Sequence, residues 1–247
     1  MKTLDKDRRE EGKIFSRVMI KLSGEALLGS KEFGIDSDIV DKIALDVVNV
    51  AKSNKEVCIV VGGGNIFRGV AGASQGIERG TADSMGMLAT VINALAIQNS
   101  IEKHNIPSRV LSAVPMQTVC EPFIRRKAIR HLEKRRIVIF AGGTGNPYFT
   151  TDTAAALRAA EMNCTVLMKG TKVDGVYTSD PVKDTNAKRY DNITYSQVLS
   201  DNLGIMDASA ISLARDNSIP IIVFSIHAEN ALVSIINGEG KKTIISN

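Results

Sequence analysis

Short apolar runs alternate along this chain with longer stretches in which apolar residues recur every three or four positions. Buried parallel strands are continuously apolar, and such runs occupy residues 18–22, 56–61, 109–113, 136–141, 165–169, 219–225 and 242–245. The three-to-four periodicity predicts helices over residues 37–53, 81–104, 122–134, 153–162, 195–199, 207–216 and 229–237. Because strands alternate with helices, we expect an α/β fold, a three-layer αβα sandwich with a mostly parallel central sheet.

The alternation begins after the first dozen residues and continues without a linker. Residues 1–13 are charged and lack periodicity, which predicts a disordered N-terminal tail. Residues 14–247 are expected to form a single domain, since their length suits one. The polar, turn-rich stretch 170–193 is longer than an ordinary connection, and loops of that length usually carry function.

Four glycine-rich turns follow predicted strands, at residues 20–25, 61–65, 141–147 and 169–175. In an open parallel sheet the carboxyl ends of the strands meet at one edge, where ligands bind. Glycine lets the backbone approach a ligand closely, and a helix after such a turn offers free N–H groups to a phosphate. Lys21, Arg68 and Lys169 lie in or beside these turns, so we expect a site that holds several phosphate groups.

The segment from Thr144 to Asp152 is the sharpest local signal. Small hydroxyl residues and glycine precede an alanine-rich helix there, so the N-terminus of that helix suits an anion. Asp152 has two interpretations, as a helix cap or as a residue that orders nearby lysines and a metal–nucleotide complex. Lys21 is either a strand-end lysine that reaches solvent or a phosphate contact, and its glycine turn favours the contact.

Missing motifs exclude several kinds of site. No segment fits the G-x-x-x-x-G-K-[ST] phosphate loop, and the glycine triplet at 62–64 does not fit the G-x-G-x-x-G dinucleotide motif. No cysteine–histidine spacing suits zinc. The basic clusters at 125–127 and 134–136 have no interleaved aromatic residues and the formal net charge is only +4, so we expect no nucleic-acid partner.

Composition indicates a cytoplasmic protein with no membrane contact. No run approaches the ~20 apolar residues of a membrane span, and the N-terminus carries no apolar leader. Cys58, Cys120 and Cys164 form no closely spaced pair, which suits a reducing compartment better than a disulfide framework.

Six motifs together resemble the amino acid kinase family and, within it, the uridylate kinases. They are Lys-Leu-Ser-Gly-Glu at 21–25, Gly-Gly-Gly-Asn-Ile-Phe-Arg-Gly at 62–69, Ala-Asp-Ser-Met-Gly-Met-Leu-Ala-Thr at 82–90, Gly-Thr-Gly-Asn-Pro-Tyr-Phe-Thr-Thr-Asp at 143–152, Lys-Val-Asp-Gly-Val-Tyr-Thr-Ser-Asp-Pro at 172–181 and Met-Asp at 206–207. The resemblance covers residues 17–245. The first motif is shared loosely across the family, whereas the Thr-Gly-Asn-Pro block is much more specific to uridylate kinases.

The resemblance implies a UMP kinase, a nucleoside monophosphate kinase that transfers the γ-phosphoryl group of ATP to UMP and yields UDP and ADP in pyrimidine synthesis. It implies Mg²⁺ carried with ATP and a cytoplasmic homohexamer. UTP is expected to inhibit, because it can occupy the UMP pocket. The resemblance also divides the domain into a UMP-binding and oligomerisation part at 14–168 and an ATP nucleoside-binding part at 169–247.

The resemblance also implies roles for individual residues. The ATP phosphates would be bound by two glycine turns and a nearby arginine: Lys21, Leu22, Ser23, Gly24, Gly64 and Arg68. Thr171, Tyr177 and Asp180 would line the adenine and ribose pocket of ATP. UMP would be bound by Gly63, by Asp83 at the ribose, and by one continuous segment: Thr144, Gly145, Asn146, Pro147, Tyr148, Phe149, Thr150 and Thr151. The catalytic residues would be Lys21, Arg68 and Asp152.

The sequence leaves two alternative functions to consider, and it differs from the GTP-activated uridylate kinases at one group of positions. The chain resembles acetylglutamate and aspartate kinases in its first motif, but the 144–151 segment argues against acyl-phosphate formation. A nucleotide-binding protein without turnover would not need its cations, and Lys21 and Arg68 are both present. Gln98, Asn99 and Glu102 stand where GTP-activated relatives carry an arginine–aspartate pair and a histidine, which predicts weak or no activation by GTP.

Overall fold

The structure is a computed structural model that describes residues 15–68 and 76–247. Its elements in chain order are β1 (Arg17–Leu22), the 3-10 helix η1 (Gly24–Leu27), α2 (Ser37–Lys52), β2 (Glu56–Val61), α4 (Arg79–Glu102), β3 (Ser108–Ser112), β4 (Glu121–Pro122), α5 (Arg125–Glu133), β5 (Ile137–Ala141), α6 (Thr151–Glu161), β6 (Val166–Thr171), β7 (Val176–Tyr177), β8 (Arg189–Tyr190), β9 (Asn192–Thr194), α7 (Tyr195–Ser200), α8 (Ala208–Asp216), β10 (Ile221–Ser225), α9 (Ala231–Ile236) and β11 (Lys242–Ser246). The disorder predicted for residues 1–13 lies outside the described residues.

The centre of the molecule is a nine-stranded sheet in the order β4-β3-β5-β2-β1-β6-β10-β11-β9. Its strand pairs are parallel except β10–β11, and β7 and β8 form a separate antiparallel pair. Strand β1 lies between β2 and β6, so three of the glycine turns follow neighbouring strands. The predicted α/β architecture with a mostly parallel sheet is confirmed.

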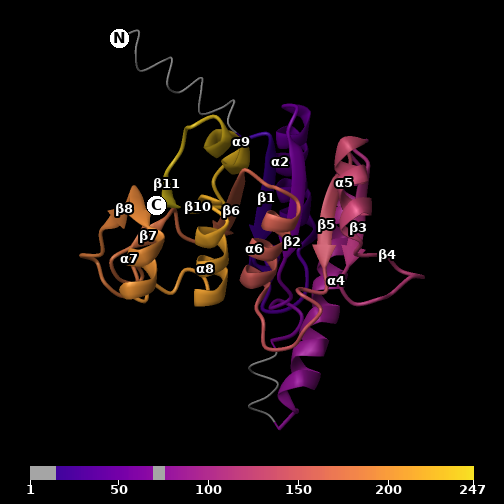
Figure 1. The fold of residues 1–247 in the computed structure, drawn as a ribbon, viewed down its shortest axis with the longest axis horizontal. Helices are drawn as coiled ribbons and strands as arrows, with labels where there is room; N and C mark the ends of the chain where they lie inside the picture. Colours follow the sequence, from indigo (N-terminus) through magenta and orange to yellow (C-terminus); the bar gives the residue numbers. More distant parts are fainter. Residues whose placement is uncertain (1–14, 69–75) are drawn as a thin grey trace.

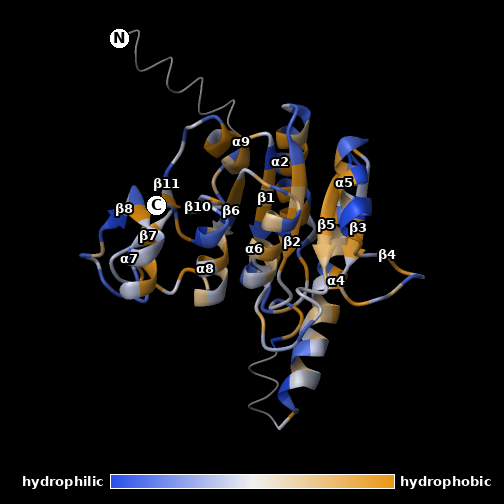
Figure 2. Ribbon diagram, viewed as in Figure 1, coloured by the Kyte–Doolittle hydropathy of each residue, from blue (hydrophilic) through white to orange (hydrophobic). Residues whose placement is uncertain are grey.

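Helices cover both faces of the sheet (Figure 1). Successive residues of β1 point to opposite faces, as the strand period of two requires. Val18 and Ile20 belong to a hydrophobic core with residues of α2, α4 and α9, whereas Met19 belongs to a second core with residues of α5, α6 and α8. The strands are therefore apolar on both sides (Figure 2), which explains their continuous apolar runs.

Helix α4 begins beyond the carboxyl edge of the sheet and runs back along one face (Figure 1). By length and composition alone it would pass as a membrane span, and such a single match is weak evidence. Val91, Ala94 and Ile97 of this helix are buried in the first core. Met85, Leu88 and Ile92 form an apolar stripe on its exposed side.

Five helix starts differ from the sequence prediction: those predicted at residues 81, 122, 153, 207 and 229 lie at Arg79, Arg125, Thr151, Ala208 and Ala231. The helix predicted from residue 122 begins at Arg125, because Glu121 and Pro122 pair with β3 as a short edge strand. The helix predicted from residue 153 begins at Thr151, because the Thr150 hydroxyl accepts the N–H groups of Asp152 and Thr153. Asp152 therefore lies in the first turn of α6 and is not its cap. The division of the domain near residue 168 stays a prediction, and β6 crosses that point.

Candidate active site

Two lysines face each other across the middle of the sheet. Strands β1 and β6 pair in a register that places Lys21 directly opposite Lys169, and both side chains point to the α6 face. They are 6% and 8% exposed, so both ammonium groups are largely withdrawn from water. Like charges opposite each other destabilise a sheet, so this pair requires a shared counter-charge.

Asp152 supplies that counter-charge from the first turn of α6. Its Oδ1 lies 2.7 Å from Lys21 Nζ, and its Oδ2 accepts a hydrogen bond from Lys169 Nζ at 2.7 Å. The Lys169 ammonium also donates to the backbone carbonyl of Ile205. An acidic residue in a first helical turn is favoured by the helix dipole, which strengthens the arrangement. The cluster Lys21–Asp152–Lys169 is thus held by β1, β6 and α6.

The pKa values of Asp152 and Lys169 are shifted by burial and by the neighbouring charges. Burial would raise the pKa of the Asp152 carboxyl, but the charges of Lys21 and Lys169 outweigh burial and hold that pKa below its usual value. Burial lowers the pKa of Lys169, although the charge of Asp152 opposes this effect. One anion between two buried cations leaves an excess of positive charge, which favours a further anion such as a phosphate.

The glycine turns pack against one another next to this cluster. A Cβ atom on Gly24 would lie 2.8 Å from the backbone nitrogen of Gly64, closer than real side chains approach. A Cβ atom on Gly62 would lie 3.4 Å from the Thr151 hydroxyl. Only small residues allow the turns after β1 and β2 to meet in this way, and the start of α6 lies in ordinary contact with them. The contacts bring the first two predicted phosphate loops to the N-terminus of α6.

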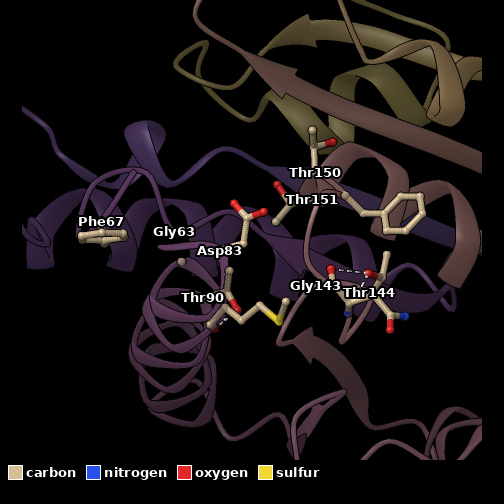
Figure 3. Close-up of a pocket in the computed structure, with 12 residues that line it drawn as sticks. Gly63, Phe67, Asp83, Thr90, Gly143, Thr144, Thr150 and Thr151 are labelled. Carbon is tan, nitrogen blue, oxygen red and sulfur yellow. Dashed lines mark hydrogen bonds between the residues drawn. The ribbon is translucent and has the colours of Figure 1, made fainter. Parts of the chain in front are cut away.

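An open pocket lies on the far side of the second turn (Figure 3). It is lined by residues from the turn after β2, the first half of α4 and the loop before α6: Gly63, Phe67, Asp83, Gly86, Met87, Thr90, Gly143, Thr144, Asn146, Phe149, Thr150 and Thr151. Seven of the ten residues predicted to bind UMP are in this lining, and Gly145, Pro147 and Tyr148 are not. The pocket mixes apolar walls with hydroxyl, amide and carboxylate groups, as small-molecule sites do.

Asp83 joins α4 to the loop that closes the pocket. Its Oδ2 accepts hydrogen bonds at 2.8 Å from Arg79 Nε and from the backbone N–H of Tyr148. The Arg79 guanidinium lies 5.7 Å from the centre of the exposed Tyr148 ring. Tyr148 has a φ of 71°, a strained value for a bulky residue that these contacts help to hold.

Arg68 does not join the buried cluster. Its side chain is 59% exposed, and its guanidinium pairs with Glu25 of η1 and donates to the Gly64 carbonyl at 3.3 Å. Lys172 Nζ lies 3.4 Å from the other carboxylate oxygen of Glu25. Arg68 and Lys172 therefore meet at the rim of the first glycine turn. Leu22 is buried at the end of β1, and the Ser23 hydroxyl caps η1.

The residues predicted to bind adenine and ribose lie along one segment. Thr171 ends β6, and its hydroxyl closes a turn by donating to the Val173 carbonyl at 2.6 Å. Tyr177 lies on β7 and donates a 2.5 Å hydrogen bond to Asp174, and this bond raises the pKa of Tyr177. Asp180 is in the loop after β7 and accepts the backbone N–H of Val182 at 3.0 Å. Their role in binding a nucleoside stays a prediction.

Two residues of the site are absent from the predicted catalytic set. Lys169 was placed beside a glycine turn by sequence, but its pairing with Lys21 depends on strand register. Asp207 accepts hydrogen bonds from the Thr150 hydroxyl and, at 2.7 Å, from the Thr153 hydroxyl, and it also caps α8. It thereby fixes the N-terminus of α6. The Met-Asp motif marked this position without indicating the role.

The candidate site has no group of metal ligands among the described residues. In residues 15–68 and 76–247, no three side chains among histidine, cysteine, aspartate and glutamate lie together as metal ligands would. Both carboxylate oxygens of Asp152 face lysines.

Comparisons with known proteins agree with this geometry. A model of the amino acid kinase family matches residues 16–225. The uridylate kinase of Paramagnetospirillum magneticum is 59% identical over 94% of this chain and 97% of its own, and that of Wolbachia pipientis wMel is 61% identical over 94% of each. Among solved structures, UMP kinase from Ureaplasma parvum superposes with a TM-score of 0.90 at 39% identity, covering 94% of this chain and 99% of its own. UMP kinase from Bacillus anthracis gives a TM-score of 0.91 at 39% identity, covering 94% and 96%.

Proposed function

The chain belongs to the amino acid kinase family, and from this membership we propose that it transfers the γ-phosphoryl group of ATP to UMP, yielding UDP and ADP. The observation that carries the proposal is the Lys21–Asp152–Lys169 cluster: Lys21 lies in the first glycine turn, and Asp152 follows Thr151, which lines the pocket together with other residues of the segment specific to uridylate kinases. The similar proteins from Paramagnetospirillum magneticum and Wolbachia pipientis are named uridylate kinases, which supports UMP as the acceptor. The product places the enzyme in pyrimidine nucleotide synthesis.

The acceptor binds in the pocket between α4 and the loop before α6. Asp83 accepts a hydrogen bond from the ribose, and the positive end of the α6 dipole at Thr151 attracts the UMP phosphate. That phosphate is largely ionised at neutral pH, since its second pKa is ~6. It attacks without a strong general base, so the pocket has to provide position and charge, which are the main requirements of phosphoryl transfer.

The donor phosphates bind along the first two glycine turns. Lys21 and Lys169 stabilise the negative charge on the transferring group, and Asp152 holds their ammonium groups apart and in place. Arg68 moves from Glu25 to the outer phosphates, while Thr171, Tyr177 and Asp180 hold the adenosine. Mg²⁺ arrives with ATP and neutralises phosphate charge when bound.

The proposed oligomeric state, inhibition by UTP and location in the cell follow from the family, and the exposed apolar side of α4 also supports the oligomeric state. The apolar stripe of Met85, Leu88 and Ile92 on α4 suits burial against another copy of this chain in a homohexamer. UTP inhibits by occupying the UMP pocket with its uridine. The enzyme works in the cytoplasm, without membrane or nucleic-acid partners.

A substrate panel tests the proposed function. We expect kcat/KM for UMP to exceed that for CMP by at least ~10-fold, because a site built to pair the uracil edge leaves its own groups unpaired against cytosine. A coupled ADP-release assay would compare UMP, CMP and dUMP, with acetylglutamate and aspartate as acceptors of the rival acyl-phosphate kinases. Equal kcat/KM for UMP and CMP would reject the acceptor assignment, and no turnover with any acceptor would favour a purely binding role.

Gly86 offers a test of where the acceptor lies. It sits inside α4, where glycine is ~1 kcal/mol less favourable than alanine, yet a Cβ atom there would meet no other heavy atom within 4 Å. The space beside it is the pocket. We expect Gly86→Ala to raise the free energy of unfolding by up to ~1 kcal/mol and to raise KM for UMP several-fold.

Urea unfolding and steady-state kinetics would measure both effects. Gly80→Ala is the matched control, because Gly80 lies in the first turn of the same helix and outside the pocket lining. The control is expected to leave KM for UMP unchanged. An unchanged KM in Gly86→Ala would place the acceptor away from α4.

A further inference from the structure

Two glycine turns flank the acceptor pocket, and they follow the neighbouring strands β2 and β5. The turn after β2 contains Gly62 to Asn65, and the turn after β5 begins at Gly142. Backbone turns with so little side-chain packing have few means of holding a position of their own. Both turns are also held by contacts from the inner face of α4.

Thr90 connects the turn after β5 to α4. Its hydroxyl oxygen accepts the backbone N–H of Gly142 at 2.7 Å, and its hydrogen is donated to the Met87 carbonyl at 2.6 Å. A hydroxyl has one hydrogen, so Thr90 donates nothing to a ligand although it lines the pocket. Its influence on a bound nucleotide therefore passes through Gly142.

Asn93 connects the turn after β2 to the same face of α4. Its Nδ2 donates to the Gly62 carbonyl at 2.7 Å and to Asn65 Oδ1 at 2.6 Å. Asn65 Nδ2 donates back to Asn93 Oδ1 at 3.0 Å and to the Gly34 carbonyl at 2.8 Å. Asn93 is fully buried and Asn65 is 3% exposed. A buried amide pair with these partners allows a single arrangement of the turn.

The middle of the turn after β2 packs directly against α4. A Cβ atom on Gly63 would lie 2.8 Å from both the Ala89 Cβ and the Gly86 carbonyl oxygen. Gly63 is also a wall of the pocket. A small shift of this turn relative to α4 would therefore change the width of the acceptor site.

We propose that Thr90 and Asn93 are positioning residues, which hold the turns after β2 and β5 at the separation that the acceptor nucleotide requires. The inference rests on the proposed function only for the identity of that nucleotide. Misplacement by about 1 Å can cost ~100-fold in rate. Loss of the Thr90 tether is expected to raise KM for UMP by about 10-fold and to leave KM for ATP within about 2-fold.

The test compares Thr90→Val, which keeps the shape of the side chain and removes the hydroxyl, with Thr90→Ser, which keeps the hydroxyl. KM for UMP is expected to rise in the valine variant and to return close to the wild-type value in the serine variant. Amide hydrogen exchange in ligand-free protein is expected to accelerate over residues 140–147 in Thr90→Val alone. This second measurement requires no substrate.

Ser100→Ala is the matched control for lost stability. Ser100 is a buried hydroxyl residue of the same helix, and its hydrogen bond goes to Asp41, away from both turns. We expect this variant to melt at a lower temperature with an unchanged KM for UMP. Asn93→Leu, where it folds, is expected to raise KM for UMP and also KM for ATP, because the turn that it holds contains both Gly63 and Gly64.

Three results would overturn the inference: an unchanged KM for UMP in Thr90→Val, equal losses in the valine and serine variants, or an equal loss in Ser100→Ala. Absence of UMP turnover by the wild-type enzyme would reject the proposed function instead. In that case the exchange rates of Thr90→Val and Thr90→Ser still decide whether the hydroxyl holds the turn.

Discussion

Lys21→Ala is expected to lower kcat by ~10²–10³-fold, which corresponds to ~3–4 kcal/mol of lost transition-state stabilisation, with the fold intact. The Lys21 ammonium is one of two cations that converge on Asp152 beside the first glycine turn. In a site withdrawn from water, a fixed charge acts strongly on the charge that develops during transfer. Lys169 remains in the variant and keeps Asp152 paired, so the substitution isolates the catalytic contribution of Lys21.

Single-turnover measurement of phosphoryl transfer would separate chemistry from product release. Lys21→Met preserves the aliphatic part of the side chain, so equal losses in the alanine and methionine variants would assign the effect to charge. Lys52→Ala removes an exposed lysine at the end of α2 and is expected to behave as wild type. Near-normal single turnover in Lys21→Ala would remove this residue from the mechanism.

Asp152→Asn is expected to weaken both catalysis and the fold. The change leaves two largely buried ammonium groups without their shared anion, and loss of one partner from a buried ion pair costs ~3–5 kcal/mol. We expect kcat to fall by ~10²-fold or more, because the lysines are no longer fixed in place. Saturating ATP is expected to restore part of the lost stability, since its phosphates supply the missing negative charge.

The two proteins are also expected to respond to pH in opposite ranges. In the wild type, the pKa of Asp152 is lowered by folding, so its contribution is present above about pH 4 and is lost as the pH falls through the folded-state pKa. In the variant, the pKa of Lys169 falls further below its unfolded value of ~10.4. The unfolded chain then binds more protons, so the free energy of unfolding rises with pH in the alkaline range.

Urea titrations from about pH 2 to about pH 10 would follow both trends. Asp38→Asn is the control, because Asp38 is an exposed carboxylate in the first turn of α2 and has no buried lysine beside it. A stability curve for Asp152→Asn parallel to that of the wild type would contradict the assigned role of the cluster.

The layered fold was predictable because of how its strands are buried. The β2 strand was predicted with its observed bounds, since a strand between two helical layers is apolar throughout. The start of α5 was mispredicted because Pro122 is also favoured in the first turn of a helix. Its role as an edge strand depends on β3, and local sequence does not carry that pairing.

The site was predictable only as far as its motifs extend. The four turns and Asp83 were assigned from sequence, and their pocket follows from the meeting of strand ends at one edge. The pairing of Lys21 with Lys169 joins strands 148 residues apart and depends on register, which no motif states. Asp152 had two interpretations until α6 was seen to begin at Thr151. The tethers from Thr90 and Asn93 depend on which face of α4 meets the turns.

The register of β1 against β6 affects which folded molecules are stable. A slip by one residue would turn Lys21 to the opposite face, where its neighbours Ile20 and Leu22 now pack among the apolar residues of α2 and α9. A lone ammonium group there would be far too costly to keep. Chains with the shifted register are therefore too unstable to persist. The register that makes the fold stable is the same one that places Lys21 opposite Lys169 in the candidate active site.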